Sequence, residues 1–110
     1  MDSKKKELIE RFLELHNATC EFDDEENLVE IEHFSSLGED FVFTIEADGF
    51  SKHLREYYDG FDAESHAVDN WNSTHLNLQN LLDDALEIDE WLEELAEDFE
   101  AKFEQIGKSL

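Results

Sequence analysis

The sequence lacks proline and contains one cysteine, four glycines and only eight basic residues among its 110. The single cysteine, Cys20, excludes a framework of internal disulfides and favours a reducing compartment. No stretch approaches the ~20 apolar residues that a membrane span needs. The start MDSKKKELIERF leads directly into an amphipathic pattern, without the apolar core of a secretory signal. We therefore expect a cytoplasmic protein with no membrane partner.

Signatures of several common activities are also missing. There is no glycine-rich phosphate loop and no basic patch, so direct binding of nucleic acid is not expected. Neither DDEENLVEIEHF nor DGFDAESHAVDN has the ligand order of a calcium-binding EF-hand loop, and His53, His66 and His75 are too scattered for zinc. Cys20 falls on the inward side of a predicted strand, where cysteine is usually a small apolar side chain. We expect no enzymatic activity, metal or cofactor.

Acidic residues dominate the composition. Asp and Glu number 31 against eight Lys and Arg, which gives a net charge of −23. Twelve acids and no base lie between Arg11 and Lys52, and fifteen acids and no base lie between Arg55 and Lys102. Adaptation to high salt fits poorly, because six of the bases are lysine and the chain is rich in Phe, Leu and Ile. Solubility requires a net charge of only about 2–8 in magnitude, so it leaves most of the acidity unexplained.

The hydrophobic pattern predicts one α+β domain over residues 1–110. Residues 3–16 place apolar side chains at helical spacing, and the pattern then alternates between apolar and polar, with breaks at DDEEN and SSLGED. Three short strands follow, and their simplest arrangement is an antiparallel meander with one face on the core. The predicted outer face of this sheet carries Glu21, Asp23, Glu30, Glu32 and Glu46.

Two short helices and one long acidic C-terminal helix are predicted after the sheet. Asp62 caps the second short helix, in which His66, Ala67 and Trp71 turn inward. The long helix starts at the cap residue Asn77 and stops at Gly107, a length of roughly 45 Å at about 1.5 Å per residue. Its apolar stripe is Leu78, Leu81, Leu82, Ala85, Ile88, Leu92, Leu95, Phe99, Phe103 and Ile106. We expect the order α-β-β-β-α-α-α, with the helices packed on one face of the sheet.

The segments FDAESHAVDNW and LQNLLDDALEIDEWLEELAEDFE combine a Phe, His and Trp motif with an acidic helix. The motif positions are Phe61, His66, Trp71, Asp84, Ala85, Ile88, Leu92, Glu94, Leu95 and Ala96. In these positions the chain resembles a family of small acidic proteins, of no established activity, found in Firmicutes and their mobile elements. The resemblance implies the fold and a mobile-element setting. Small acidic proteins of mobile elements include inhibitors of CRISPR and restriction nucleases, and by this association alone we expect an anti-CRISPR-like role.

The acids of the last helix form a regular row. Asp83, Glu87, Glu90, Glu94, Glu97 and then Glu100 or Ala101 follow one another by three or four residues. Such positions lie about 5–6 Å apart on one helix face, and like charges there cost about 0.2–0.5 kcal/mol per pair. No Lys or Arg offsets this cost between Leu81 and Ala101. The row has roughly the charge spacing of one nucleic-acid strand, and the acids of the sheet could supply a second track.

We therefore predict a binding protein that imitates nucleic acid and blocks the basic groove of a nucleic-acid enzyme, such as a CRISPR or restriction nuclease. The predicted partner-binding residues are Glu87, Glu90, Glu94, Glu97 and Asp98 on the helix, with Glu30 and Glu32 on the sheet. The alternative is a structural or assembly protein of a mobile element, which binds itself or another protein through apolar surface and is acidic incidentally. His66 and Trp71 are predicted to pack beneath the last helix, with a surface recognition pair as the alternative. Monomer and homodimer both stay open.

Overall fold

The computed structural model describes residues 2–72 and 76–106 of the chain, with side chains described up to residue 102. Its elements are α1 (Ser3–Leu15), β1 (Ala18–Asp23), β2 (Leu28–Phe34), β3 (Asp40–Glu46), α2 (Phe50–Gly60), α3 (Ala63–Trp71) and α4 (Leu78–Ile106). The predicted α+β class and the order α-β-β-β-α-α-α are confirmed.

The three strands form an antiparallel meander in the order β1-β2-β3. The register places Cys20 opposite Ile31 and Ile31 opposite Phe43, so these side chains share the inner face of the sheet. Along each strand, buried or half-buried apolar residues alternate with exposed ones. The predicted acids occupy the outer positions, where Glu21, Asp23, Glu30 and Glu46 are exposed and Glu32 is half-buried.

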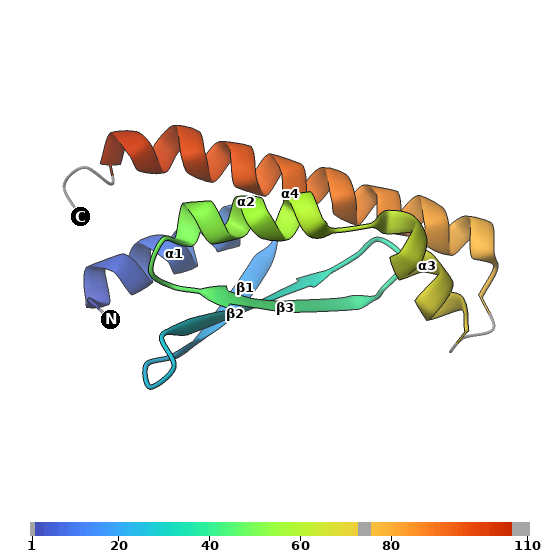
Figure 1. Cartoon of the computed structure of the whole chain (residues 1–110), viewed down its shortest axis with the longest axis horizontal. Coiled ribbons are helices and arrows are strands. Elements are labelled where there is room, and N and C mark those ends of the chain that lie inside the picture. The colour runs from blue at the N-terminus through green and yellow to red at the C-terminus, as the bar shows by residue number, and fades with distance from the viewer. Residues whose placement is uncertain (1, 73–75, 107–110) are drawn as a thin grey trace.

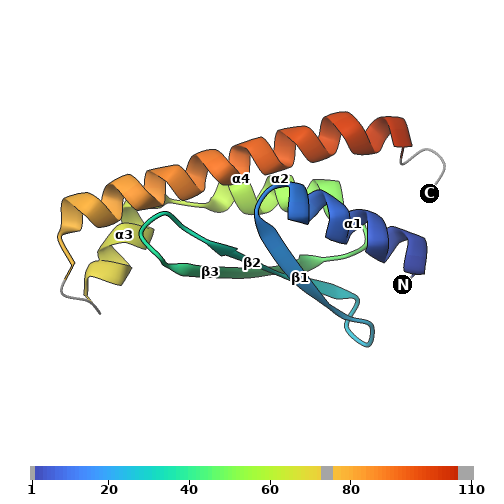
Figure 2. The same ribbon diagram turned by 180° about the vertical axis from the view of Figure 1, so that it is seen from behind.

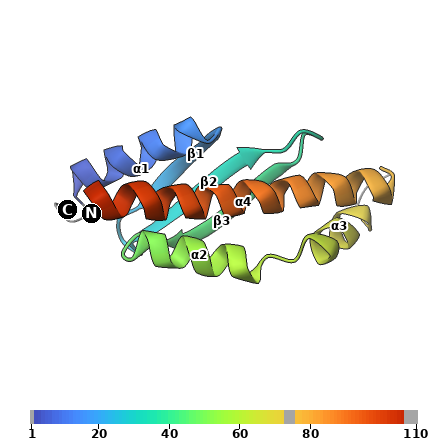
Figure 3. The ribbon, with the colours of Figure 1, turned by 90° about the horizontal axis from the view of Figure 1, so that it is seen from above.

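Helices α1, α2 and α4 lie on the same side of the sheet (Figures 1 and 2). Seen from above, α1 and α2 flank α4 (Figure 3). Each helix buries one apolar face: Ile9, Phe12 and Leu13 on α1, Phe50 and Leu54 on α2, and Ile88, Leu92, Leu95 and Phe99 on α4. The inner face of the sheet and these helix faces together make the core, and none of the described helices covers the outer face of the sheet (Figures 1 and 2).

The starts of the helices follow the sequence signals. The carboxylate of Asp62 accepts hydrogen bonds from the backbone N–H groups of Glu64 and Ser65 at 3.1 and 3.3 Å, which caps α3. The side chain of Asn77 accepts one from the N–H of Gln79 at 2.7 Å at the start of α4. Both predicted caps are confirmed, whereas the predicted stop at Gly107 lies outside the described residues.

Helix α4 spans the molecule. Its 29 residues measure about 44 Å at about 1.5 Å per residue, close to the longest molecular dimension of 47 Å. Phe99 is fully buried, and its ring centroid lies 4.9 Å from that of Phe12 on α1 and 4.7 Å from that of Phe50 on α2. The predicted apolar stripe is buried except at Leu82, which is half-buried, and at Leu78, which is exposed at the first residue of the helix. The side chains of Phe103 and Ile106 lie outside the described part.

The prediction that Trp71 turns inward is wrong, because 47% of this residue is exposed. Helix α3 packs on α4 through the small residues Ala63 and Ala67 and then diverges from α4 towards its C-terminal end (Figure 1). Trp71 is the last residue of α3 and therefore lies clear of α4. His66 turns inward as predicted: it is half-buried, its imidazole packs on the rings of Phe41 and Phe61, and it also contacts a carboxylate from the turn between β2 and β3.

Candidate functional site

Acidic side chains form a ridge along the exposed face of α4. Asp83, Glu87, Glu90, Glu94 and Glu97 are all exposed, and each follows the previous one by three or four residues, which places them on one helix face. Helix α4 is the layer farthest from the sheet (Figure 1), so this face is an outer surface of the molecule. We refer to these five residues as the acidic ridge.

On the side of α4 that faces α2, the acids have partners. Arg55 donates hydrogen bonds to both carboxylate oxygens of Glu100, from Nε at 2.8 Å and from Nη2 at 2.9 Å, and this contact lowers the pKa of Glu100. The hydroxyl of Tyr58 donates to Glu93 at 2.7 Å, which raises the pKa of Tyr58 to about 12. Glu100 thus holds α2 against α4 and does not extend the ridge.

On the side that faces α1, two of the predicted partner-binding acids also have contacts within the protein. The hydroxyl of Ser36 donates a hydrogen bond to Glu87 at 2.7 Å. The Nε2 atom of His16 lies 3.3 Å from a carboxylate oxygen of Asp98, which is half-buried. Glu87 stays exposed as part of the ridge, whereas Asp98 lies on its flank and links α4 to the end of α1.

The crest of the ridge has no such contacts. No hydrogen bond or ion pair joins Glu90, Glu94 or Glu97 to any residue that the structure describes. Together with Glu93 they line a shallow groove of about 470 Å³. Within the described chain the crest has no ion-pair contact, although the charge of Arg55 interacts with that of Glu97 at longer range.

The two acids predicted on the sheet lie on a different surface. Glu30 pairs with Glu21 directly across the β1–β2 ladder, on the outer face of the sheet. A hydrogen bond with Asp40 raises the pKa of Glu32, and burial and the charges of Asp40, Glu30 and Glu21 act in the same direction. Because α4 covers the opposite face of the sheet (Figure 2), the structure does not join Glu30 and Glu32 with the ridge. The molecule has two separate acidic surfaces.

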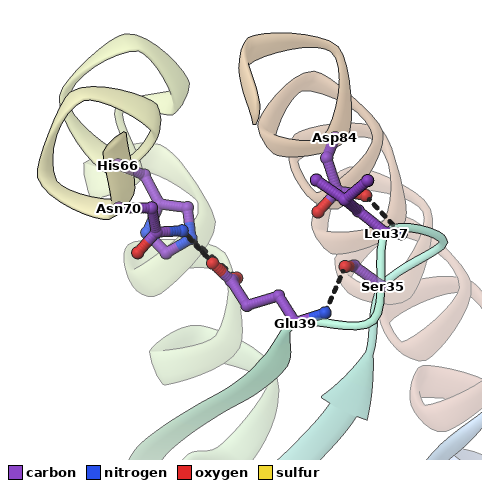
Figure 4. A network of polar contacts seen from close by, with 6 residues as sticks. All are labelled: Ser35, Leu37, Glu39, His66, Asn70 and Asp84. Carbon is purple, nitrogen blue, oxygen red and sulfur yellow. Dashed lines mark hydrogen bonds and ion pairs between the residues drawn. The ribbon is translucent and has the colours of Figure 1, made fainter. Parts of the chain in front are cut away.

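Other acids are structural, and they meet at the turn between β2 and β3 (Figure 4). The carboxylate oxygens of Glu39 lie 2.8 and 3.0 Å from Nε2 of His66, and one of them accepts a hydrogen bond from the side-chain amide of Asn70. A carboxylate can only accept, so Nε2 of His66 carries a hydrogen. These contacts tie the turn to α3.

Asp84 ties the same turn to α4. It is 7% exposed, and its carboxylate accepts a hydrogen bond from the backbone N–H of Leu37 at 3.0 Å. The turn itself closes at Gly38, whose φ of +92° is a conformation that glycine adopts readily. We call Glu39, His66, Asn70 and Asp84 the turn clamp.

Cys20 has the surroundings of an unreactive thiol, and the described histidines belong to no metal cluster. Cys20 is half-buried on the inner face of β1, and burial, with the charges of Glu10 and Glu14, raises the pKa of its thiol to about 11. The thiolate that a nucleophile requires is therefore scarce at neutral pH. Among residues 2–72 and 76–106, no group of three or more His, Cys, Asp or Glu side chains is arranged to hold a metal ion. No helix in the same ranges combines the length and apolar character needed to span a bilayer.

Comparisons of the chain with protein-family models, with curated proteins and with solved structures found no match. The resemblance to small acidic proteins of mobile elements thus stays a prediction from the motif residues. The case for function depends on the surfaces described above.

Proposed function

We propose that this protein is an acidic binding protein that imitates nucleic acid and occupies the basic groove of a nucleic-acid enzyme, such as a CRISPR or restriction nuclease. One observation carries the proposal: the crest residues Glu90, Glu94 and Glu97 are exposed, regularly spaced and without partners in the described chain. A groove lined with Lys and Arg would be attracted to this crest, and the association would be fast and sensitive to salt.

The geometry of the ridge favours imitation of one strand. From Asp83 to Glu97 the helix rises about 21 Å, at about 1.5 Å per residue, and the five acids are about 5 Å apart. A DNA duplex carries one charge per about 1.7 Å of its axis, a density that one helix cannot match. The sheet acids lie on the opposite side of the molecule and add nothing to this track. The groove that fits the ridge is therefore one that follows a single phosphate backbone.

Affinity capture with three forms of the protein tests the proposal. The forms are the natural chain, the ridge variant E90K/E94K/E97K, and the control variant E21K/E25K/E30K, which makes the same charge change away from α4. We expect a basic nucleic-acid enzyme to be captured from a lysate of the source cells by the natural chain and the control, released at moderate salt, and lost with the ridge variant. Equal capture by the ridge variant would contradict the proposal.

A second candidate function, self-association or protein assembly through apolar surface, is favoured by one observation. Val68 and Trp71 lie three residues apart on α3, on one helix face, and are 45% and 47% exposed. Assembly through this face predicts a dimer that persists in 1 M NaCl and is lost in V68S/W71A. Sedimentation velocity over a range of protein concentrations separates the two functions, because nucleic-acid imitation needs no dimer.

A further inference from the structure

A pocket of about 340 Å³ lies beside the acidic ridge, between the end of α1, the end of β2 and α4. The residues that matter for its chemistry are Asn17, His33, Phe34, Ser36, Glu87 and Trp91. The α1–β1 connection and the β2–β3 turn, which supply several of these residues, lie on the same side of α4 (Figure 3). Glu87 belongs both to this pocket and to the ridge, so a partner seated on the ridge would reach the pocket.

Two contacts fix the imidazole of His33. Its Nδ1 atom lies 2.9 Å from the carbonyl oxygen of Asn17, and since a carbonyl oxygen can only accept, Nδ1 carries the hydrogen of this bond. In the tautomer with its hydrogen on Nδ1, the Nε2 atom is a hydrogen-bond acceptor. The ring also stacks on Trp91, with centroids 4.0 Å apart and planes 7° from parallel.

The neighbouring donors of the pocket wall are already used within the protein. The indole N–H of Trp91 donates to the carbonyl oxygen of His16 at 2.7 Å, and the hydroxyl of Ser36 donates to Oε1 of Glu87 at 2.7 Å. In the described part of the chain, no hydrogen bond engages Oε2 of Glu87. His33 and Glu87 therefore offer a ligand two acceptors, one of them charged, beside the exposed aromatic ring of Phe34.

We propose that this pocket binds the guanidinium group of an arginine side chain supplied by a protein partner. A guanidinium is planar, permanently charged and rich in N–H donors, and it stacks on aromatic rings. The carboxylate of Glu87 and Nε2 of His33 accept its hydrogen bonds, and the exposed side chain of Phe34 contacts its flat face and its methylene groups. A lysine ammonium is compact and strongly hydrated, so it suits an aromatic wall less well.

The arginine must come from another molecule. The two arginines of this chain are both engaged elsewhere, Arg11 with Glu7 at 2.8 Å and Arg55 with Glu100. We assign this arginine to the enzyme whose basic groove meets the ridge, and that assignment rests on the proposed function. Arginine is enriched among the side chains that dominate interface energies, and a seated arginine would add a specific contact to a ridge that otherwise acts through charge.

An NMR titration of the ¹⁵N-labelled protein in 150 mM NaCl tests the pocket directly. N-acetyl-arginine amide is expected to give saturable shifts at His33, Ser36 and the indole N–H of Trp91, and to bind at least fivefold more tightly than N-acetyl-lysine amide. Glu87→Gln should weaken the binding at least fivefold, whereas Glu25→Gln, which removes one charge from the exposed turn between β1 and β2, should change it less than twofold. Absence of saturable shifts at the pocket, equal binding of the lysine compound, or equal effects of the two variants would each overturn the assignment.

Free L-arginine separates a partner's side chain from a small molecule. We expect it to bind no more tightly than the amide, because no Lys or Arg is among the described residues that line the pocket and could hold its carboxylate. Binding tighter by tenfold or more would overturn the assignment to a protein side chain and show an amino-acid site instead. The titration needs no partner, so the two proposals are tested separately. A negative titration would overturn the arginine pocket but not the proposed function of the ridge. A negative affinity capture would overturn the proposed function but not a positive titration.

Discussion

The two sides of α4 use acidic residues in opposite ways. On the inner side, Asp84 is buried and accepts a hydrogen bond from the β2–β3 turn. On the outer side, the crest residues Glu90, Glu94 and Glu97 are exposed and have no partner in the described chain. Acid content alone therefore does not tell which carboxylates maintain the fold and which are available to a partner. The contacts of each carboxylate within the protein distinguish these two roles.

The largest expected effect concerns the aromatic residue that anchors the inner side. We expect Trp91→Ala to lower the free energy of unfolding by about 3–5 kcal/mol, because it removes a large half-buried side chain that packs against the core and donates a hydrogen bond to His16. The same change at Trp71, which is 47% exposed, should cost less than about 1 kcal/mol. Urea unfolding monitored by circular dichroism measures the free energy lost in each variant. Equal losses would contradict the difference in burial between Trp91 and Trp71.

The next largest effect on stability is expected from a comparison of the adjacent residues Asp83 and Asp84. Asp84→Ala leaves the N–H of Leu37 without its acceptor and should cost about 1–3 kcal/mol of unfolding free energy. Asp83→Ala removes the same group one residue earlier, on the exposed ridge, and should change stability by less than about 0.5 kcal/mol. Urea unfolding of the two variants under identical conditions gives the difference. A loss at Asp83 as large as at Asp84 would show that the ridge is structural.

Reversing the crest charges should have a smaller effect of opposite sign. In E90K/E94K/E97K the repulsion between the crest residues and their unchanged acidic neighbours Glu87, Glu93 and Asp98, about 0.2–0.5 kcal/mol per pair, is replaced by attraction, while the three lysines repel one another as the glutamates did. We expect unfolding free energy at low salt to stay constant or rise, and the gain to shrink in 1 M NaCl, where charges act over only about 3 Å. Destabilisation by more than about 1 kcal/mol would mean that the crest acids hold the fold together.

The smallest effects are on pH dependence, and two glutamates should differ in sign. The pKa of Glu100 is lowered by Arg55, so Glu100 contributes stability above its unfolded-state pKa, and this is lost as pH falls towards its folded-state pKa. The pKa of Glu32 is raised by Asp40, so its penalty at neutral pH disappears as pH falls from its folded-state pKa to its unfolded-state pKa.

A carbon-detected NMR titration of the side-chain carboxyls measures both pKa values. Asp40→Asn should move the pKa of Glu32 downward and leave that of Glu100 unchanged. Shifts in the same direction for Glu32 and Glu100 in the natural chain would refute this part of the account.

Periodicity predicted the elements of the fold well because each depends on local spacing. The alternation around Val29 and Ile31, the cap at Asp62 and the cap at Asn77 are signals within a few residues, and all three appear in the structure. The placement of Trp71 failed because it depends on where α3 diverges from α4. Spacing within α3 alone does not contain that information.

The turn clamp was missed because its contacts join distant residues. Glu39 and His66 are 27 positions apart, and Leu37 and Asp84 are 47 apart. One signal was available, since Asp84 stands three residues after Leu81 and one before Ala85 in the apolar stripe. A carboxylate at such a position is expected to be buried and hydrogen-bonded.

The candidate site was predicted in part. Helical spacing correctly placed Glu90, Glu94 and Glu97 on one exposed face. The separation of Glu30 and Glu32 from that face follows from the layers: because α4 packs over the inner face of the sheet, its exposed side points away from the outer face of the sheet. The pocket around His33 was not predictable, since it depends on the meeting of α1, β2 and α4.

Mutual exclusion between this protein and nucleic acid tests the central claim most directly. An oligonucleotide that the captured enzyme binds would be added at increasing concentration to the purified complex, and release of this protein would be followed by fluorescence anisotropy of a label on α1. The account predicts full displacement, with the oligonucleotide and the protein competing for one site. A stable ternary complex, in which the enzyme holds both at once, would contradict the claim that the acidic ridge occupies the nucleic-acid groove.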